Sequence, residues 1–230
     1  MPKTKGHAGL AIQHAPVMVE AGAAHLEGLL SVPTDAHGVV LFAHGSGSSH
    51  RSPRNRSVAD VLNEGGLATL LIDLLTNDEQ QVDLQTAHLR FDIAFLAGRL
   101  LAATDWLRAS HDAGSLPVGY FGASTGAAAA LRAAAERTEL VRATVSRGGR
   151  PDLAHNALAR VVAPTLLIVG ERDTAVIELN RVAMAQMHGP KELVIVPGAT
   201  HLFEEPGALE QVAMLARDWF TQWLPEIVKH

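Results

Sequence analysis

A serine flanked by glycines stands where a predicted strand gives way to a predicted helix. The segment GASTG (122–126) follows the apolar run 117–121 and precedes the alanine-rich run 127–136. A tight strand-to-helix turn pushes a serine hydroxyl into solvent and requires small residues two positions away on either side. The N-terminus of the following helix offers free N–H groups and partial positive charge, which suit a developing oxyanion. The pattern therefore predicts that Ser124 is a nucleophile.

A serine hydroxyl needs a base, and two candidate partners follow it in chain order. Asp173 comes after the run 164–170 and His201 after the run 192–198, at intervals of 49 and 28 residues. Each interval has room for a helix and a strand, so both side chains can reach the same end of a parallel sheet. We expect His201 to take the proton of Ser124 and return it to the leaving group. We expect Asp173 to orient the imidazole and stabilise its protonated form.

Other acidic residues lie near the same turns. Glu171 and Asp152 are rival partners for the histidine. Glu204 and Glu205 are predicted at the N-terminus of the last helix, where negative charge is favoured. The chain has 12 histidines, so one histidine in a loop says little, and the ordered set of serine, aspartate and histidine carries the prediction.

A glycine-rich loop, HGSGSS (44–49), follows the apolar run 38–43. Glycine at position 45 allows backbone N–H groups to approach a bound oxygen, so Gly45 is predicted to border the substrate. In an acyl-transfer site one oxyanion donor is the N–H after the nucleophile and the second comes from such a loop. We therefore expect the amides of Thr125 and Ser46 to form the oxyanion hole, with His44 holding the loop by hydrogen bonds.

The same loop could instead belong to a dinucleotide site, because Gly45 and Gly47 follow a strand and Asp73 ends the next strand. The third position of that fingerprint is His50 rather than glycine, and Asp73 lies 28 residues beyond Gly45 rather than about 20. We therefore expect no cofactor. The histidines form no metal-binding motif and the chain has no cysteine, so no metal site is predicted either.

Arginines lie close to the predicted site. Arg147 and Arg150 follow the run 142–146, whose end should border the site, and three more arginines, Arg51, Arg54 and Arg56, follow the glycine-rich loop. A guanidinium fork could bind a carboxylate of an acidic substrate, which makes Arg147 a candidate substrate-binding residue. The competing interpretation is structural, with the arginines solvated or paired to Asp152 or to glutamates.

Composition limits the class of protein. The 230 residues are 47% hydrophobic and 19% charged, with a formal net charge of −5, which excludes a disordered polyelectrolyte and provides no basic surface for nucleic acid. The apolar runs are too short for a transmembrane helix, and the N-terminus is a poor signal peptide. We expect a flexible tail at 1–9, a single domain at 10–230, a cytoplasmic location, no membrane partner, and a monomer or homodimer.

Short apolar runs alternate with helical patterns, which predicts an α/β fold with a mostly parallel sheet and helices on both faces. Run 25–32 alternates in polarity, which suits an antiparallel edge strand. The predicted strands are 16–21, 25–32, 38–44, 67–73, 117–123, 142–146, 164–170 and 192–198. The predicted helices are 53–61, 91–109, 125–137, 179–187 and 206–224.

Four motifs, HGSGSS, GASTG, GERD and GATHLFEEPG, make the chain similar to the α/β-hydrolase superfamily over residues 16–224. They most resemble its small, dienelactone hydrolase-like branch. The resemblance implies an eight-stranded, mostly parallel sheet in a three-layer sandwich and cofactor-free ester hydrolysis through an acyl-enzyme. The short stretch between residues 146 and 164 leaves no room for a lid domain.

One departure from that family affects the expected reaction. Well-known dienelactone hydrolases carry a cysteine nucleophile, whereas this chain has Ser124, which favours an ordinary carboxylesterase acting on small esters or lactones. Two alternatives use the same pocket: a non-catalytic ligand-binding protein, and an acyltransferase or perhydrolase whose acyl-enzyme reacts with an acceptor other than water.

Overall fold

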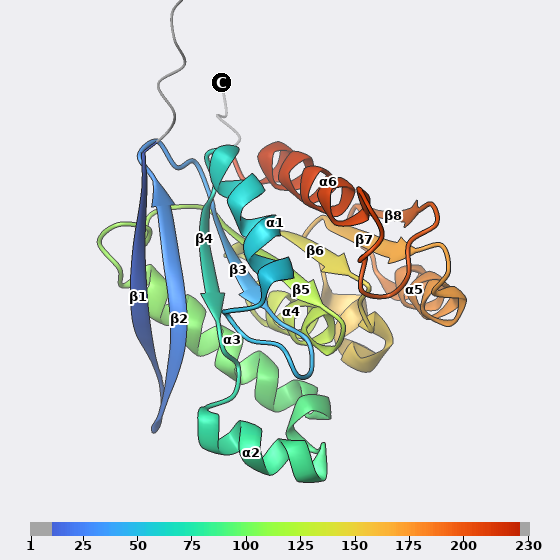
Figure 1. Ribbon diagram of the computed structural model, residues 1–230, viewed down its shortest axis with the longest axis horizontal. Helices are drawn as coiled ribbons and strands as arrows, with labels where there is room; N and C mark the ends of the chain where they lie inside the picture. Colours follow the sequence, from blue (N-terminus) through green and yellow to red (C-terminus); the bar gives the residue numbers. More distant parts are fainter. Residues whose placement is uncertain (1–10, 226–230) are drawn as a thin grey trace, which may run out of the picture.

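The computed structural model describes residues 11–225, which form an eight-stranded sheet between two layers of helices (Figure 1). The predicted tail at residues 1–9 lies outside the described residues. The strands lie side by side in the order β1-β2-β4-β3-β5-β6-β7-β8. Their bounds are β1 (Ile12–Ala21), β2 (Ala24–Pro33), β3 (Val39–Ala43), β4 (Ala68–Ile72), β5 (Val118–Ala123), β6 (Val141–Arg147), β7 (Thr165–Gly170) and β8 (Lys191–Val196).

The antiparallel part of the sheet differs from the prediction at one point. β2 pairs antiparallel with β1 on one side and with β4 on the other, and the later pairings are parallel. β2 is therefore antiparallel but internal, and β1 is the edge strand. The chain reverses through Gly22, at φ +67°, so that β1 runs back along the whole of β2 and covers its outer side. The largely exposed side chains of β1 suit that edge position.

Helices cover both faces of the sheet, as predicted (Figure 1). One face carries α1 (Pro53–Glu64) and α6 (Ala208–Trp223), and the other carries α3 (Ile93–Arg108), α4 (Thr125–Glu136) and α5 (Thr174–Gln186). Strands β3, β4, β5 and β7 are buried along their whole length, because helices exclude water from both of their sides. No helix among residues 11–225 is both long enough and apolar enough to cross a membrane.

Capping residues set the starts of α1 and α3. Ser52 accepts a hydrogen bond from the Asn55 amide at 3.5 Å and α1 begins at the next residue, a proline, as predicted. Asp92 caps α3, which therefore begins at residue 93 rather than 91. α5 begins at residue 174 rather than 179, because the chain passes directly from the turn at Asp173 into the helix.

Three helical segments were not predicted: α2 (Asn77–Thr86) and the 3₁₀ segments η1 (Leu89–Phe91) and η2 (Pro151–Arg160). Asp83 is the one buried residue of α2, so this helix shows no apolar periodicity. Instead, a reciprocal capping box holds its first turn: Thr76 Oγ1 accepts from the Glu79 amide at 3.2 Å, and the Glu79 carboxylate accepts from the Thr76 amide at 2.8 Å. Between β6 and β7 the chain forms only η2 and short turns, without a lid domain, as predicted.

Candidate active site

Ser124 lies on a sharp turn between β5 and α4, and its backbone is in an unusual conformation. Its φ of 50° and ψ of −122° are rarely adopted by a residue with a side chain, and such a conformation costs about 1–3 kcal/mol. The two neighbouring glycines make the turn possible. A Cβ at Gly122 would lie 2.4 Å from the Ala127 Cα, and a Cβ at Gly126 would lie 2.1 Å from the Ala43 carbonyl oxygen. The requirement for small residues at these two positions is therefore steric.

We expect Gly126→Ala to destabilise the protein by about 3 kcal/mol or more, because the added methyl group meets rigid backbone. Gly98→Ala is the matched control. Gly98 lies exposed in the interior of α3 with no atom within 4 Å of its Cβ position, so this change should stabilise by roughly 0.5–1 kcal/mol. Urea unfolding of both variants measures the difference. Equal stability of Gly126→Ala and the wild type would show that α4 does not need this close approach.

Asp173 and His201 lie in direct contact on the turns that follow β7 and β8. The Asp173 Oδ2 atom is 2.6 Å from the His201 Nδ1 atom, and the two side chains are 16% and 39% exposed. The two turns are joined by backbone hydrogen bonds, including one from the Arg172 amide to the Ala199 carbonyl at 2.9 Å. Asp173 therefore holds the imidazole through Nδ1 and leaves Nε2 for another partner.

The rival carboxylates have other partners. Glu171 accepts a hydrogen bond from the Gly198 amide at 2.7 Å, and this bond joins the turn after β7 to the turn that carries His201. Asp152 accepts two hydrogen bonds from Arg150, at 2.9 and 2.8 Å. Glu205 accepts from the Thr200 amide at 3.1 Å, just before α6. Hydrogen bonds from Thr200 lower the pKa of Glu205.

The segment after β6 connects the serine turn to the histidine turn. The Ser124 amide donates to the Arg147 carbonyl at 3.3 Å, and the Arg150 amide donates to the Ser124 carbonyl at 3.0 Å. Between them lies Gly148, whose Cβ position is 3.5 Å from the His201 Cε1 atom. The structure thus places Ser124 and His201 beside the same short segment. The Ser124 hydroxyl makes no hydrogen bond to another residue in the described part of the chain.

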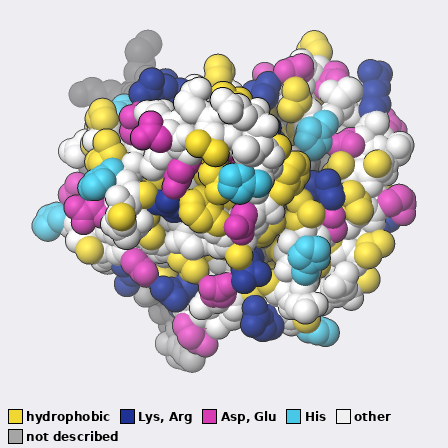
Figure 2. Space-filling view, turned by 90° about the horizontal axis from the view of Figure 1, so that it is seen from below, with side chains coloured by type: hydrophobic (Ala, Val, Ile, Leu, Met, Phe, Trp, Pro, Cys, Tyr) yellow, Lys and Arg dark blue, Asp and Glu magenta, His cyan; other side chains and the backbone are white. Residues whose placement is uncertain are grey.

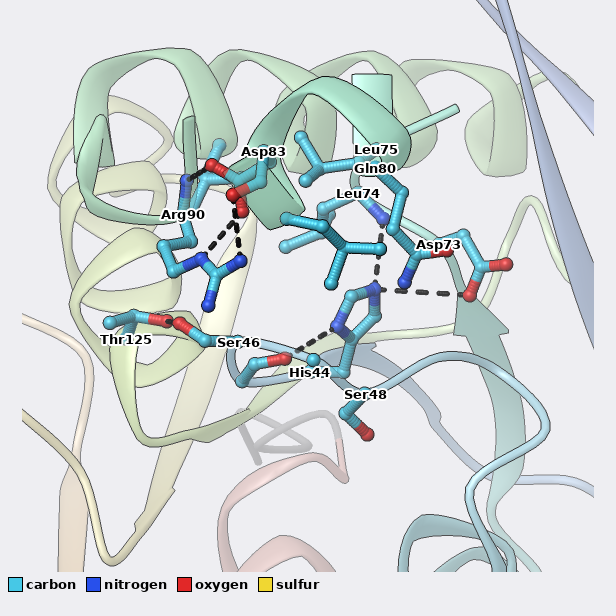
Figure 3. Close-up of a pocket in the computed structure, with 14 residues that line it drawn as sticks. His44, Ser46, Ser48, Asp73, Leu74, Leu75, Gln80, Asp83, Arg90 and Thr125 are labelled. Carbon is cyan, nitrogen blue, oxygen red and sulfur yellow. Dashed lines mark hydrogen bonds and ion pairs between the residues drawn. The ribbon is translucent and has the colours of Figure 1, made fainter. Parts of the chain in front are cut away.

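The glycine-rich loop packs directly on the serine turn. The Cβ position of Gly45 lies 2.9 Å from the Ser124 Cβ atom, so only glycine permits this approach. The Ser46 and Thr125 hydroxyls are 3.2 Å apart, and both residues line one cavity (Figure 3). Within residues 11–225 neither the Ser46 amide nor the Thr125 amide donates a hydrogen bond to the protein. Two N–H groups are therefore free beside the serine, one of them in the first turn of α4.

His44 holds this loop in place by hydrogen bonds, as predicted. Its Nδ1 atom is 2.9 Å from the Gly45 carbonyl oxygen and its Nε2 atom accepts from the Leu74 amide at 3.1 Å (Figure 3). Those two contacts require a neutral imidazole with the proton on Nδ1. Burial lowers the pKa of His44 and outweighs the opposing effects of the Gly45 carbonyl and Asp73, which keeps the ring neutral.

A cavity lies between the glycine-rich loop and α2. The empty space between its walls, including the part open to solvent, is about 490 Å³. Its apolar wall comes from Leu74, Leu75, Leu84 and Leu96. The Asp83–Arg90 ion pair, at 2.6 Å, lies at the α2 side (Figure 3). From below, Figure 2 shows hydrophobic side chains gathered around a histidine near the centre of the face, with charged side chains around them.

The cavity wall formed by α2 was not predicted from the sequence. The capping box at residues 76–79 was the available signal for this helix. Burial alone would raise the pKa of Asp83, but hydrogen bonds from Arg90 and Leu89 and the Arg90 charge outweigh it and lower the pKa. Asp83 is therefore ionised when it fastens the end of α2 to η1.

A second group of polar side chains lies beyond the cavity. Glu27, His50 and Asp73 offer ligand atoms within 4.8 Å of one another, a donor set of the kind that binds metal ions. In this structure these side chains form hydrogen bonds with one another and with Arg51. The His50 amide and ring bond to the two Asp73 oxygens at 2.5 and 2.8 Å, and Arg51 donates to Glu27 at 2.9 Å. Hydrogen bonds within the protein therefore already engage His50, Asp73 and Glu27.

Two comparisons place the chain among known proteins. The dienelactone hydrolase family matches residues 26–227. The crystal structure of a dienelactone hydrolase from Anabaena variabilis is 61% identical, with a TM-score of 0.91, and the match covers 93% of this chain and 99% of that one. Est1E from Butyrivibrio proteoclasticus matches at 18% identity over 90% of this chain and 98% of its own, with a TM-score of 0.75, which shows the shared fold alone.

Two curated Mycobacterium tuberculosis proteins, from different strains, are 60% identical to this chain over 208 residues. Their names describe candidate phosphoribosyl transferases. The match covers 90% of this chain but 46% of theirs, so the chain spans about half the length of these relatives. The eight-stranded sheet, the serine turn and the family match agree: the chain has the α/β-hydrolase fold and belongs to the dienelactone hydrolase family.

Proposed function

We propose that this chain is a serine hydrolase that cleaves small carboxylic esters or lactones through an acyl-enzyme. The observation that supports this most is the 2.6 Å contact between Asp173 and His201 beside a strained serine turn. A backbone held in a costly conformation at Ser124 and two free amides next to it suit catalysis better than passive binding. Membership of a hydrolase family supports the same assignment.

In the first half-reaction the Ser124 hydroxyl attacks the ester carbonyl carbon, and the His201 Nε2 atom takes the hydroxyl proton. The carboxylate of Asp173 stabilises the imidazolium that forms. The carbonyl oxygen becomes an oxyanion, which accepts hydrogen bonds from the amides of Ser46 and Thr125. When the bond to the leaving group breaks, His201 delivers its proton to the departing alkoxide, and an acyl-enzyme remains on the serine.

In the second half-reaction water attacks the acyl-enzyme carbonyl. His201 takes a proton from the water and returns it to the Ser124 oxygen as the carbon–oxygen bond to serine breaks. The products are a carboxylic acid and the regenerated serine. The Ser124 hydroxyl makes no hydrogen bond to His201 in the described structure, which is compatible with these steps, because catalytic hydrogen bonds often form or shorten only when substrate binds.

The apolar cavity beside the oxyanion donors suits one hydrocarbon part of the substrate. Burial of apolar surface there contributes about 25 cal/mol per Å². Leu74, Leu84 and Leu96 would contact this part.

The transferase name of the M. tuberculosis relatives is not proposed for this chain. More than half of each relative lies outside the match, and the serine turn and its partners lie inside residues 26–227. Acyl transfer to an acceptor other than water would use the same acyl-enzyme, so the acceptor must be measured directly.

A panel of 4-nitrophenyl esters with acyl chains of two to eight carbons, together with simple lactones, tests the proposal. We expect turnover of the shorter esters and release of free acid in water. Added methanol or hydrogen peroxide shows whether another acceptor competes for the acyl group. A protein that turns over no ester and no lactone on this panel would contradict the proposed function.

A further inference from the structure

Asn180 is a fully buried asparagine in the middle of α5, and its side chain binds outside its own helix. Its Nδ2 atom donates to the Gly149 carbonyl at 3.0 Å and to the Val176 carbonyl, one turn earlier in α5, at 2.8 Å. Its Oδ1 atom is buried without a hydrogen-bond partner among the described residues, which is unfavourable. The two N–H donors of this side chain must therefore offset the cost of burying it.

Gly149, which lies between β6 and η2, has few ways to be held in place. In the described part of the chain it takes part in no backbone–backbone hydrogen bond. It follows Gly148, whose φ is +50°, and two successive glycines give the chain unusual conformational freedom. A side chain cannot anchor it, since its Cβ position lies 1.9 Å from the Ser146 Oγ atom and 2.6 Å from the Ala127 Cβ atom. The Asn180 amide therefore supplies the hydrogen bond that fixes this residue.

Gly149 lies between two residues that contact the proposed nucleophile and base. On one side, the Arg150 amide donates to the Ser124 carbonyl at 3.0 Å. On the other side, the Cβ position of Gly148 is 3.5 Å from the His201 Cε1 atom. A displacement of Gly149 would therefore reach both the serine turn and the histidine ring through its direct neighbours in the chain.

The Asn180 amide belongs to the helix that follows the proposed acid. α5 begins directly after Asp173, and Asn180 lies about two turns further along. The Ile177 amide donates to the Asp173 carbonyl at 3.0 Å, so the backbone of the acid is already part of the first turn. A rigid helix thus connects the acid to Asn180, and the amide of Asn180 connects that helix to the segment beside the serine.

We propose that Asn180 is a positioning residue for the hydrolysis: through Gly149 it holds the nucleophile and the base at fixed positions relative to Asp173. The inference rests on the proposed function for its effect on turnover, but not for its effect on the serine turn. Neither Asn180 nor Gly149 lines the cavity, so the binding of substrate there does not use them. Loss of the bond should therefore change kcat rather than KM.

Asn180→Leu removes both N–H donors with little change in side-chain volume. We expect kcat for the best ester of the panel to fall by about 10- to 100-fold and KM to change by less than about threefold, because misplaced reacting groups slow the chemical step. Loss of the buried bonds should also lower the melting temperature by about 2–10 °C. Rates are therefore measured well below that temperature, on samples that circular dichroism shows to be folded.

Asn63→Leu is the matched control. Asn63 is 2% exposed in α1, and its Nδ2 atom donates to the Leu67 carbonyl at 2.8 Å and to the Thr69 Oγ1 atom at 3.1 Å. These partners lie at the start of β4, whereas the cavity borders the end of that strand. The control should lose a similar amount of stability and keep kcat within about twofold of the wild type.

Asn180→Ser is the second variant if the leucine variant does not fold. A serine hydroxyl can donate to the carbonyl one turn earlier in its helix but is too short to reach Gly149. It therefore preserves the bond within α5 and removes the bond between elements, and kcat should fall as it does with leucine.

Amide hydrogen exchange tests the positioning without any hydrolysis. The Ser124 amide donates to the Arg147 carbonyl at 3.3 Å, and the Arg150 amide donates to the Ser124 carbonyl. We expect both amides to exchange at least about tenfold faster in Asn180→Leu than in Asn63→Leu, because local opening adds to the global destabilisation that the two variants share.

Equal kcat in Asn180→Leu and Asn63→Leu, a loss confined to KM, or equal exchange at the two amides would overturn the proposal. Failure of the wild type to hydrolyse any ester would contradict the proposed function instead. Hydrogen exchange would then still decide whether Asn180 holds the serine turn, so the two failures are distinguishable.

Discussion

Replacement of Ser124 by alanine is expected to lower kcat/KM for any ester that the wild type hydrolyses by about 10⁴- to 10⁶-fold. The hydroxyl oxygen is the atom that forms the acyl bond in the proposed mechanism, and no other group can replace it on the same turn. The loss should appear in kcat, because the cavity and the oxyanion donors remain. Initial rates with the best ester of the panel, on protein purified away from host esterases, measure it.

The fold should survive this change. Ser124 lies on a turn, and its hydroxyl makes no hydrogen bond to another described residue, so the melting temperature should move by no more than a few degrees. Ser115→Ala is the matched control, since Ser115 is exposed and precedes β5, whereas Ser124 follows that strand. A loss below 100-fold in Ser124→Ala would mean that another group is the nucleophile.

Replacement of Asp173 by asparagine is expected to lower kcat by about 10⁴-fold. An amide cannot stabilise the imidazolium that forms when His201 takes the serine proton, and its NH₂ group can favour the wrong tautomer of the ring. Stability should change little, because Asp173 precedes α5 without using its side chain as a cap. Steady-state rates and melting temperature on the same samples separate the two effects.

Asp152→Asn is the control for the acid. Its carboxylate pairs with Arg150 rather than with the histidine, so its loss should reduce kcat by less than tenfold. A result in which Asp152→Asn, or Glu171→Gln, loses more activity than Asp173→Asn would contradict the assignment of the acid.

Much of the fold could be predicted because the parallel strands are buried on both faces and appear in the sequence as unbroken apolar runs. The edge was less predictable. Residues 25–32 alternate in polarity like an edge strand. In the structure, however, β1 pairs with them as a hairpin partner and occupies the edge, where its own side chains are mostly exposed. The α2 helix was not predicted, because ion pairs and a capping box stabilise it and its sequence shows no apolar spacing.

The candidate site also has a part that the sequence predicts and a part that it does not. The chain order of Ser124, Asp173 and His201 predicts that they meet at one end of a parallel sheet, since strand ends are fixed by topology. The sequence treats Arg147 and Arg150 alike, as two arginines three positions apart. Only the packing distinguishes them, because Arg150 pairs with Asp152, whereas the buried Arg147 Nη1 atom has no hydrogen-bond partner among the described residues.

The central claim is that Ser124 is an activated nucleophile, and mass spectrometry after reaction with a fluorophosphonate measures this directly. The proposed mechanism predicts one phosphonyl adduct per chain, located on the peptide that contains Ser124, with labelling much slower in Asp173→Asn. An unlabelled Ser124 in protein that hydrolyses esters, or an adduct on a different residue, would contradict it.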